Sequence, residues 1–228
     1  MSKVANPNLP PGTTGLVLHQ AARYDLIVWL ITFGRERAFR EAILRPARLQ
    51  PGESVLDVGC GTGSLAIAAK RQVGSTGLVR GIDASPEMIA RADRKAARAG
   101  LDVVFTNAAA QTLPFGDAQF DVVLTTLVLH HLPRKAREQS AQEIRRVLKS
   151  SGRVLAVDFA APTEKERRPL FHRHRHGHVD VAEIGALFSG AGFAVVDSGG
   201  VGFRDLQFVL ALPKAEDGAV VPLEEARP

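Results

Sequence analysis

Residues 55–66 read VLDVGCGTGSLA: an apolar run that contains Asp57 is followed by Gly59, Gly61 and Gly63 and then by small residues. The apolar run favours a buried strand, whereas the residues after Gly63 favour a helix. Glycine has no Cβ, so a ligand can approach the main chain, and a helix N-terminus offers free N–H groups to a negative group. The stretch therefore predicts a strand, a ligand-binding loop and a helix.

The rest of the chain alternates between strand and helix patterns. Ser85 is a candidate N-cap with Pro86 at the first helical position, and Gly100 is placed to end that helix. Such alternation predicts an α/β fold with a doubly wound, seven-stranded, mostly parallel sheet, in which ligands bind outside the carboxyl ends of the strands. Strands are expected at 54–58, 78–82, 102–106, 120–126, 154–159, 193–197 and 205–212, and helices at 64–72, 86–100, 135–149 and 180–189, the last opened by an Asp180–Glu183 capping box.

The two ends of the chain differ from this repeat. Residues 1–12 are rich in proline and predict a poorly ordered lead, and residues 214–228 predict a flexible acidic tail. Between them we expect one domain over 13–213, with a helical cap over 13–45 in which Leu26, Leu30 and Phe33 form one apolar stripe.

Composition narrows the class of protein. One cysteine in 228 residues allows no intramolecular disulfide, and neither a signal peptide nor a bilayer-long apolar run is found, so a cytoplasmic location is expected. The net charge of +5 and pI of about 9.8 favour anionic partners. With one Trp, one Tyr and no basic block, we expect a solvated basic surface and no nucleic-acid partner.

A second acid stands at the nucleotide-binding distance from the glycine loop. Asp83, in GIDAS, ends the next predicted strand, where a carboxylate can bind both hydroxyls of a ribose. This acid suits a nicotinamide dinucleotide and any other adenosine-bearing ligand equally. The dinucleotide motif G-x-G-x-x-G needs a glycine at position 64, however, and Ser64 stands there. The observed pattern, D-x-G-x-G-x-G, therefore argues against NAD(P).

Several stretches in order resemble the Rossmann-like, class I S-adenosylmethionine-dependent methyltransferases. The likeness runs from about 54 to 212 and is strongest in VLDVGCGTG, GIDASPEMIARA, LPFGDAQFDVVLTTLVLHHL and EIRRVLKSSGRVLAVDF. Within that class the chain is similar to the ubiquinone/menaquinone-biosynthesis group of small-molecule methyltransferases. Residues 24–44, YDLIVWLITFGRERAFREAIL, resemble the N-terminal helical region of that group.

The resemblance implies a cofactor, S-adenosyl-L-methionine, and a set of residues that bind it. It places the glycine loop under the methionine part of the cofactor, with the Gly59 carbonyl at its ammonium and Asp57 ordering the loop. It also places Asp83 at the ribose hydroxyls. The residues implied in cofactor binding are Asp57, Gly59, Cys60, Gly61, Gly63, Asp83, Ala84, Met88, Asn107, Ala109, Ala110 and Leu127.

The chain departs from the family pattern at three places. Ala109 stands where the family has Asp or Asn for the adenine amino group, and the loss of that bond costs about 1 kcal/mol unless Asn107 or a backbone carbonyl replaces it. Ser150-Ser151-Gly152 replaces Pro-Gly-Gly. Leu26-Ile27 replaces the Met-Asn that follows Tyr-Asp in the family, so the resemblance does not fix a quinone as the acceptor.

His130 and His131 follow the fourth predicted strand on the expected substrate side. Either imidazole can take a proton from an acidic acceptor as the methyl group moves, or the pair can simply shape the loop. Tyr24 and Asp25 are candidates for the substrate pocket, together with His131. Cys60 has no partner base in the sequence pattern and is interpreted as a small filler of the loop.

Residues 171–178, FHRHRHGH, carry four alternating histidines and two arginines. On a helix His172 and His176 would have a metal-binding spacing, but Arg173 and Arg175 disfavour a divalent ion there. We therefore predict no metal site, and interpret the stretch as a basic insert that attracts an anionic substrate or membrane headgroups.

The sequence thus predicts an S-adenosylmethionine-dependent methyltransferase whose acceptor is a small or lipid-like molecule, methylated on carbon or oxygen. Peripheral contact with a membrane is compatible with this prediction, and no oligomeric state is predicted. The alternatives are an NAD(P)-dependent oxidoreductase, a nucleic-acid methyltransferase, for which TTLVLHH lacks the expected Asn/Asp-Pro-Pro stretch, and a binding module without catalysis.

Overall fold

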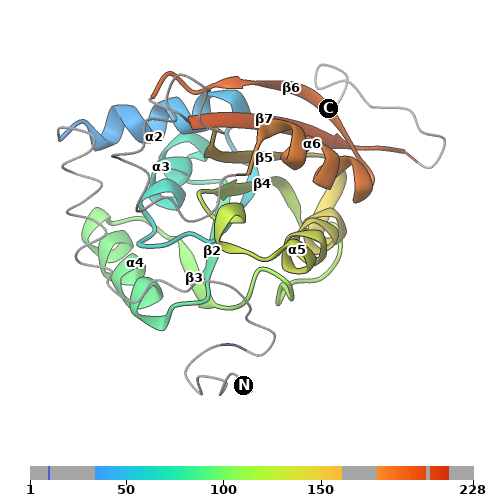
Figure 1. Cartoon of the computed structure of the whole chain (residues 1–228). Helices are drawn as coiled ribbons and strands as arrows, with labels where there is room; N and C mark the ends of the chain where they lie inside the picture. Colours follow the sequence, from blue (N-terminus) through green and yellow to red (C-terminus); the bar gives the residue numbers. More distant parts are fainter. Residues whose placement is uncertain (1–9, 11–33, 161–178, 204–205, 216–228) are drawn as a thin grey trace, which may run out of the picture.

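A computed structural model describes residues 10, 34–160, 179–203 and 206–215 of the chain. Its centre is a seven-stranded sheet in the order β3-β2-β1-β4-β5-β7-β6 (Figure 1). The first five strands pair in parallel, and β7 lies antiparallel to both β5 and β6. The strands are β1 (Ser54–Val58), β2 (Leu78–Asp83), β3 (Val104–Asn107), β4 (Phe120–Thr126), β5 (Leu148–Phe159), β6 (Phe193–Gly200) and β7 (Leu206–Pro213). The predicted doubly wound sheet is confirmed.

Helices cover both faces of the sheet (Figure 1). The apolar side chains of the inner strands alternate between two core clusters, as expected for strands buried on both sides. Val55 and Leu124 belong to one cluster, and their neighbours Leu56 and Val123 belong to the other. The helices are α2 (Glu36–Leu44), α3 (Ser64–Val73), α4 (Pro86–Ala99), α5 (Arg134–Val147) and α6 (Val181–Gly190), with 3-10 turns η1 (Arg45–Ala47) and η2 (Leu129–His131).

Helix ends explain where the predicted boundaries succeed and fail. The Ser85 side chain accepts a hydrogen bond from the Met88 N–H at 3.3 Å, and Gly100 ends α4 with a positive φ of 64°. The expected capping box at α6 is wrong in its detail, because the Asp180 side chain makes no capping bond. Strand β5 begins at Leu148, earlier than the expected 154, because residues before the bulge continue to pair with β4.

The strand order reverses between β1 and β4, which are neighbours although two strands separate them in the chain. Their registers align Val58 with Ile82 on β2 and with Thr125 on β4. The carboxyl ends of the three strands therefore meet at one edge of the sheet, and the glycine loop lies there. This is the position at which doubly wound sheets bind their ligands.

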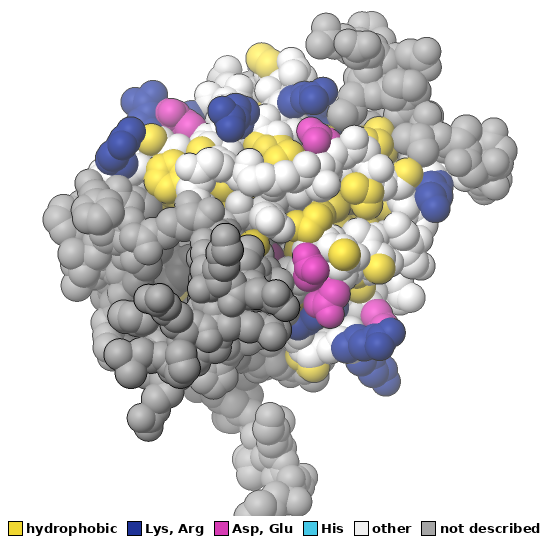
Figure 2. All heavy atoms as spheres, turned by 45° about the horizontal axis from the view of Figure 1, so that its top comes forward, with side chains coloured by type: hydrophobic (Ala, Val, Ile, Leu, Met, Phe, Trp, Pro, Cys, Tyr) yellow, Lys and Arg dark blue, Asp and Glu magenta, His cyan; other side chains and the backbone are white. Residues whose placement is uncertain are grey.

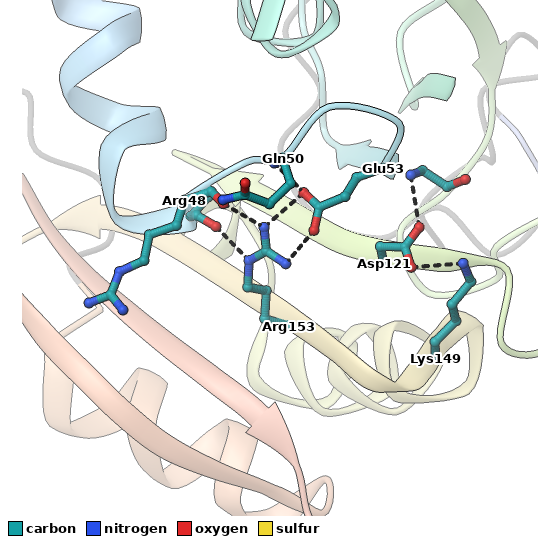
Figure 3. A network of polar contacts seen from close by, with 8 residues as sticks. Arg48, Gln50, Glu53, Asp121, Lys149 and Arg153 are labelled. Carbon is teal, nitrogen blue, oxygen red and sulfur yellow. Dashed lines mark hydrogen bonds and ion pairs between the residues drawn. The ribbon is translucent and has the colours of Figure 1, made fainter. Parts of the chain in front are cut away.

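Arg153 on β5 joins the segment after α2 to the sheet (Figure 3). Its guanidinium donates to Glu53 at 2.7 and 2.8 Å and to the carbonyls of Ala47 and Arg48. The side chains of this ion pair are only 6% and 15% exposed. An ion pair this buried is costly to break, so Arg153 holds the segment that follows α2 against β5.

Charged side chains lie in small separate groups on the face shown in Figure 2, and among the described residues of that face Lys and Arg form no continuous stripe. Several Lys and Arg side chains of the described residues have acidic partners, such as Arg146 with Glu143 and Asp117. Within the described ranges, no helix has both the length and the apolar character needed to cross a bilayer.

Candidate cofactor site

The glycine loop between β1 and α3 has left-handed backbone at Gly59, Gly61 and Gly63, with φ of 74°, 53° and 77°. A Cβ on Gly59 would lie 2.2 Å from Val128 Cγ2, and one on Gly63 would lie 2.7 Å from Phe105 Cζ. Packing inside the protein therefore requires both of these glycines. Gly61 differs, because no atom would lie within 4 Å of its Cβ. Of the three glycines predicted to admit a ligand, Gly61 is the one whose missing side chain leaves open space.

Asp83 at the end of β2 fixes the conformation of this loop. Its two carboxylate oxygens accept hydrogen bonds from the Gly61 and Ser85 N–H groups, each at 2.9 Å. Burial raises the pKa of this carboxyl, whereas the two N–H groups lower it. Each carboxylate oxygen has a further lone pair, so the group can still accept two ribose hydroxyls. The resemblance implied that Asp57 orders the loop; among the described residues, Asp83 makes the hydrogen bonds that hold it.

Asp57 is buried, with 1% of its surface exposed. Burial and the nearby Asp83 raise the pKa of this carboxyl to about 7, against the opposing influence of Arg40 and the Ala66 N–H. Its Oδ2 atom has no hydrogen-bond partner in the described part of the chain. A buried acceptor without a donor is uncommon in folded proteins and calls for an explanation.

A pocket joins the glycine loop to the ends of β1 and β4. The predicted residues Asp57, Gly59, Cys60, Gly61 and Leu127 all line it, and Gly63 does not. The other described lining residues are Arg40, Thr62, Ser64, Leu65 and Thr126.

Arg40, on α2, was not among the predicted site residues. Its side chain is buried and lines the same pocket as Asp57, although α2 lies outside the strand–helix repeat. The sequence signal was weak, because an arginine on an amphipathic helix is usually solvated. The nearby acidic residues Glu36 and Glu41 also favoured the interpretation that Arg40 is solvated.

Leu127 follows β4 with a positive φ of 58°, which is rare for a residue with a branched side chain. Its N–H donates to the Val157 carbonyl at 2.8 Å, so the sheet enforces this conformation. Strained residues of this kind cluster at functional sites. Leu127 lines the pocket beside Thr126, and the resemblance to class I methyltransferases implied that it binds the cofactor.

The predicted adenine side lies at the ends of β2 and β3. The Asn107 side-chain amide donates to the Asp83 carbonyl at 2.9 Å, which leaves its Oδ1 atom oriented away from that bond as a candidate acceptor for an amino group. Met88 and Ala109 are buried, whereas Ala84 and Ala110 are partly exposed.

Cys60 is buried in the loop, and burial, Asp57 and Asp83 together raise the pKa of its thiol well above the ordinary value. A protonated thiol is a poor nucleophile. The interpretation of Cys60 as a small packing residue fits this environment.

His130 and His131 lie in η2, next to the end of β5. His130 Nδ1 is 2.6 Å from Asp158 Oδ1, and the His130 N–H donates to Asp158 Oδ2 at 3.2 Å. The Asp158 carboxyl is buried, and a further bond from the Phe159 N–H fixes it. Sequence reasoning selected His130 but missed Asp158, because the pairing depends on β4 and β5 being neighbours in the sheet.

His131 differs from His130, with the two ring centroids 3.8 Å apart. Burial and the neighbouring His130 lower the pKa of His131 to about 4, so it is neutral at physiological pH. His131 lacks a carboxylate partner among the ion pairs of the described residues, and His130 has one.

Some predicted features lie outside the described residues. These are the Leu26, Leu30 and Phe33 stripe, the pocket candidates Tyr24 and Asp25, and the run from His172 to His178. Over the ranges that the structure does describe, no group of three or more His, Cys, Asp or Glu side chains is arranged to hold a metal ion.

Comparison with known proteins shows which proteins the chain is similar to. Residues 55–152 match the family described as "Methyltransferase domain". The chain is 37% identical over 142 residues to the demethylmenaquinone methyltransferase of Halalkalibacterium halodurans, covering 62% of this chain and 57% of that protein. It is 35% identical over 153 residues to the ubiquinone/menaquinone biosynthesis C-methyltransferase UbiE of Blochmanniella pennsylvanica, covering 66% and 59%. The chain thus spans less than two thirds of the length of these relatives.

Solved structures share the fold. A SAM-dependent methyltransferase from Aquifex aeolicus superposes with a TM-score of 0.63 and 24% identity, over 76% of this chain and 88% of the other. The [4+2]-cyclase SpnF superposes with a TM-score of 0.64 and 20% identity, over 78% and 80%. The recognition from sequence is confirmed over the matched part of the chain: residues 55–152 match a methyltransferase domain, and the solved structures share its fold. The cyclase shows that this fold also carries other activities, so the site must decide the chemistry.

Proposed function

We propose that the chain is an S-adenosylmethionine-dependent methyltransferase that modifies carbon or oxygen of a small or lipid-like acceptor. The observation that carries the proposal is the bridge that Asp83 makes between the Gly61 and Ser85 N–H groups at the switch point of the sheet. This bridge places the Asp83 carboxylate beside Gly61, whose missing side chain leaves open space. Both residues lie in the part of the chain that matches a methyltransferase domain.

Each part of the cofactor has candidate residues. Asp83 would accept the ribose hydroxyls, and Asn107, Ala84, Met88, Ala109 and Ala110 would surround the adenine. Asp57, Gly59, Cys60, Gly61 and Leu127 would surround the methionine end, with Gly63 allowing the turn into α3. When bound, the cofactor supplies an electrophilic methyl group on a sulfonium, which an acceptor displaces in line. Alignment of acceptor and methyl carbon provides much of the rate.

His130 and Asp158 suit the acceptor side of this reaction. An ionised carboxylate only accepts hydrogen bonds, so Asp158 holds the proton on His130 Nδ1 and leaves the Nε2 lone pair of a neutral ring for a proton. We propose that His130 removes the proton of an acceptor hydroxyl. The resulting oxyanion attacks the methyl carbon directly, or drives attack from a ring carbon that later loses its own proton. In both cases the bond from sulfur to methyl breaks.

The names of the similar proteins favour a quinol-like ring as the acceptor. A hydroxylated ring can be methylated on carbon or oxygen by the steps above. We also propose that residues 13–213 act as one domain whose cap and 160–180 segment close over the pocket and exclude water, that the enzyme works in the cytoplasm, and that contact with a membrane surface is peripheral.

The test is a screen of the purified chain with methyl-labelled S-adenosylmethionine against quinol precursors, phenols, carboxylates, thiols and phospholipids. The expected result is label in a hydroxylated ring compound together with S-adenosylhomocysteine. Cofactor binding without transfer to any acceptor would favour a binding module. Binding of NAD(P) in place of S-adenosylmethionine would favour an oxidoreductase, and a steeply salt-dependent affinity for RNA or DNA would favour a nucleic-acid enzyme.

A further inference from the structure

Turn η2, which carries the candidate base His130, has little internal support. Its described backbone bonds run from the His131 N–H to the Val128 carbonyl at 2.9 Å and from the Leu132 N–H to the Leu129 carbonyl at 3.1 Å. Short 3-10 turns have poorer hydrogen-bond geometry than α-helices, so contacts from outside the turn matter for its position.

Asp158 supports this turn at one place. Its carboxylate lies 2.6 Å from His130 Nδ1 and accepts the His130 N–H at 3.2 Å. These two contacts hold a ring nitrogen and a peptide N–H of the same residue. The direction in which His130 Nε2 points also depends on where the two ends of the turn lie, and those ends need donors for their carbonyls.

Arg137 on α5 supplies a donor to both ends of the turn. Its Nε atom lies 2.8 Å from the Leu129 carbonyl oxygen and 2.9 Å from the Leu132 carbonyl oxygen, so one N–H is shared between two acceptors. Leu129 directly precedes His130, and Leu132 directly follows His131. The two bonds therefore flank the pair of histidines, and the Arg137 side chain that makes them is only 20% exposed.

The other surroundings of Arg137 do not account for an arginine at this position. Its Nη1 atom is 3.9 Å from Glu183 Oε2 on α6, a long contact to a side chain that is 63% exposed, and such ion pairs contribute little. Helix α5 begins at Arg134 with no acid in its first turn, although the helix dipole favours acids and disfavours cations at this end. The bonds from Nε to the turn are what remains.

We infer that Arg137 is a positioning residue for the reaction, because its Nε–H holds η2 so that His130 meets the acceptor in one orientation. The inference rests on the proposed function, in which His130 takes the proton of the acceptor. Arg137 acts on the carbonyls of the turn and Asp158 acts on the ring, so the base is fixed from two sides. A loosened turn would slow the reaction and leave cofactor binding intact, since a small displacement of a catalytic group costs rate.

Two substitutions separate the Nε–H bonds from the charge of Arg137. In Arg137→Gln the amide nitrogen is as many bonds from the backbone as Nε, and it can donate to both carbonyls without a positive charge. Arg137→Met has a similar length and donates nothing. With the acceptor found in the labelling screen, Arg137→Met should lower kcat about tenfold and keep KM and the affinity for S-adenosylmethionine within about twofold. Arg137→Gln should stay within about threefold of the wild-type kcat.

Nuclear magnetic resonance of the imidazole rings tests the inference without an acceptor. Proton–nitrogen correlation spectra of the wild type should show the His130 proton on Nδ1, as its bond to Asp158 requires. Arg137→Met should broaden these ring signals or show both tautomers, whereas Arg137→Gln should keep the wild-type spectrum. A general loss of stability would not single out the signals of one histidine.

Arg134→Ala is the matched control, because Arg134 lies in the same part of α5 with a 92% exposed side chain paired to Glu138. Glu183→Ala removes the long ion pair of Arg137. Both variants should keep the wild-type kcat and the wild-type His130 signals.

Two results would overturn the inference: a wild-type kcat in Arg137→Met, or a loss in Arg137→Gln that brings kcat about tenfold below the wild type. The second result decides even if Arg137→Met failed to fold. A wild type that transfers a methyl group to no acceptor would contradict the proposed function instead, and the ring spectra would still decide whether Arg137 orients His130.

Discussion

The two ends of the proposed cofactor site differ in how their polar groups are satisfied. At the ribose end, both oxygens of Asp83 are hydrogen-bonded to backbone N–H groups, and Asn107 supports the same turn. At the methionyl end, Asp57, Arg40 and Thr126 keep buried atoms without partners in the described chain. The polar groups of the first end are paired within the protein, whereas those of the second keep unpaired atoms that the proposed cofactor would satisfy. The predictions below test this contrast.

Arg153→Ala should have the largest effect, because it removes the buried guanidinium that ties the segment after α2 to β5. We expect the free energy of unfolding to fall by about 3–5 kcal/mol, since Glu53 is left buried without its cation. Chemical denaturation measures this. The control is Lys149→Ala, whose ion pair with Asp121 is 39% and 28% exposed and should contribute less than about 1 kcal/mol. Equal losses in the two variants would contradict this role of Arg153.

Asp158→Asn should lower kcat by about 100-fold while changing cofactor affinity little, because it removes the acceptor that orients His130. Steady-state kinetics with the acceptor found in the labelling screen measures kcat, and calorimetry measures the affinity. His130→Ala should match this loss. His131→Ala serves as the comparison and should lose less, because His131 has no carboxylate partner among the described ion pairs. A normal kcat in Asp158→Asn would exclude the pair from proton transfer.

Asp57→Asn should separate stability from binding. The folded pKa of Asp57 is about 7, raised from 3.8, so between these values the folded state holds a proton that the unfolded state has lost. Stability from this group therefore falls as pH rises from about 4 to 7, by roughly 2–4 kcal/mol in all. Because asparagine does not ionise, the variant should be more stable than the wild type at pH 8, and the difference should shrink at pH 5.

The same variant should bind S-adenosylmethionine more weakly at pH 7.5, since Asp57 no longer faces the ammonium with a charge. Thermal unfolding across pH and calorimetry are the two measurements. If the stability advantage of the ligand-free Asp57→Asn variant over the wild type did not grow with pH, the pKa of Asp57 would not be raised in the folded state.

Asp83→Ala should weaken S-adenosylmethionine binding at least about tenfold, because the loop and the ribose both lose their carboxylate. Unlike Asp57→Asn, it should also destabilise the apo protein, since the Gly61 and Ser85 N–H groups lose their acceptor. Calorimetry and thermal unfolding of the same sample give both values. An unchanged affinity would remove Asp83 from the ribose role.

The predictable parts of this molecule are those with local causes. The ends of α4 are set by local contacts of Ser85, Pro86 and Gly100. The strands could be predicted because their residues are mostly apolar. The position of the glycine loop could be predicted, but the reason for two of its glycines could not. Val128 and Phe105 exclude side chains at Gly59 and Gly63, and both come from other parts of the chain.

The parts that could not be predicted depend on partners brought together by topology. Asp158 meets His130 because β5 lies beside β4, and Arg40 lines the pocket from α2, whose following segment is bonded to Arg153 on β5. The spacing of residues along the sequence does not indicate that His130 contacts Asp158 or that Arg40 lines the pocket. The glycines and Leu127 of the pocket were thus predicted from the sequence, while Arg40, which comes from outside the strand–helix repeat, was missed.

A crystal structure of the chain with S-adenosylhomocysteine tests the central claim most directly. The account predicts that the ribose hydroxyls lie within hydrogen-bond distance of Asp83 and that the amino-acid end lies between Arg40 and Asp57, which satisfies their unpaired atoms. Density for the ligand elsewhere, or a pocket at the glycine loop that stays empty at saturating ligand, would contradict it.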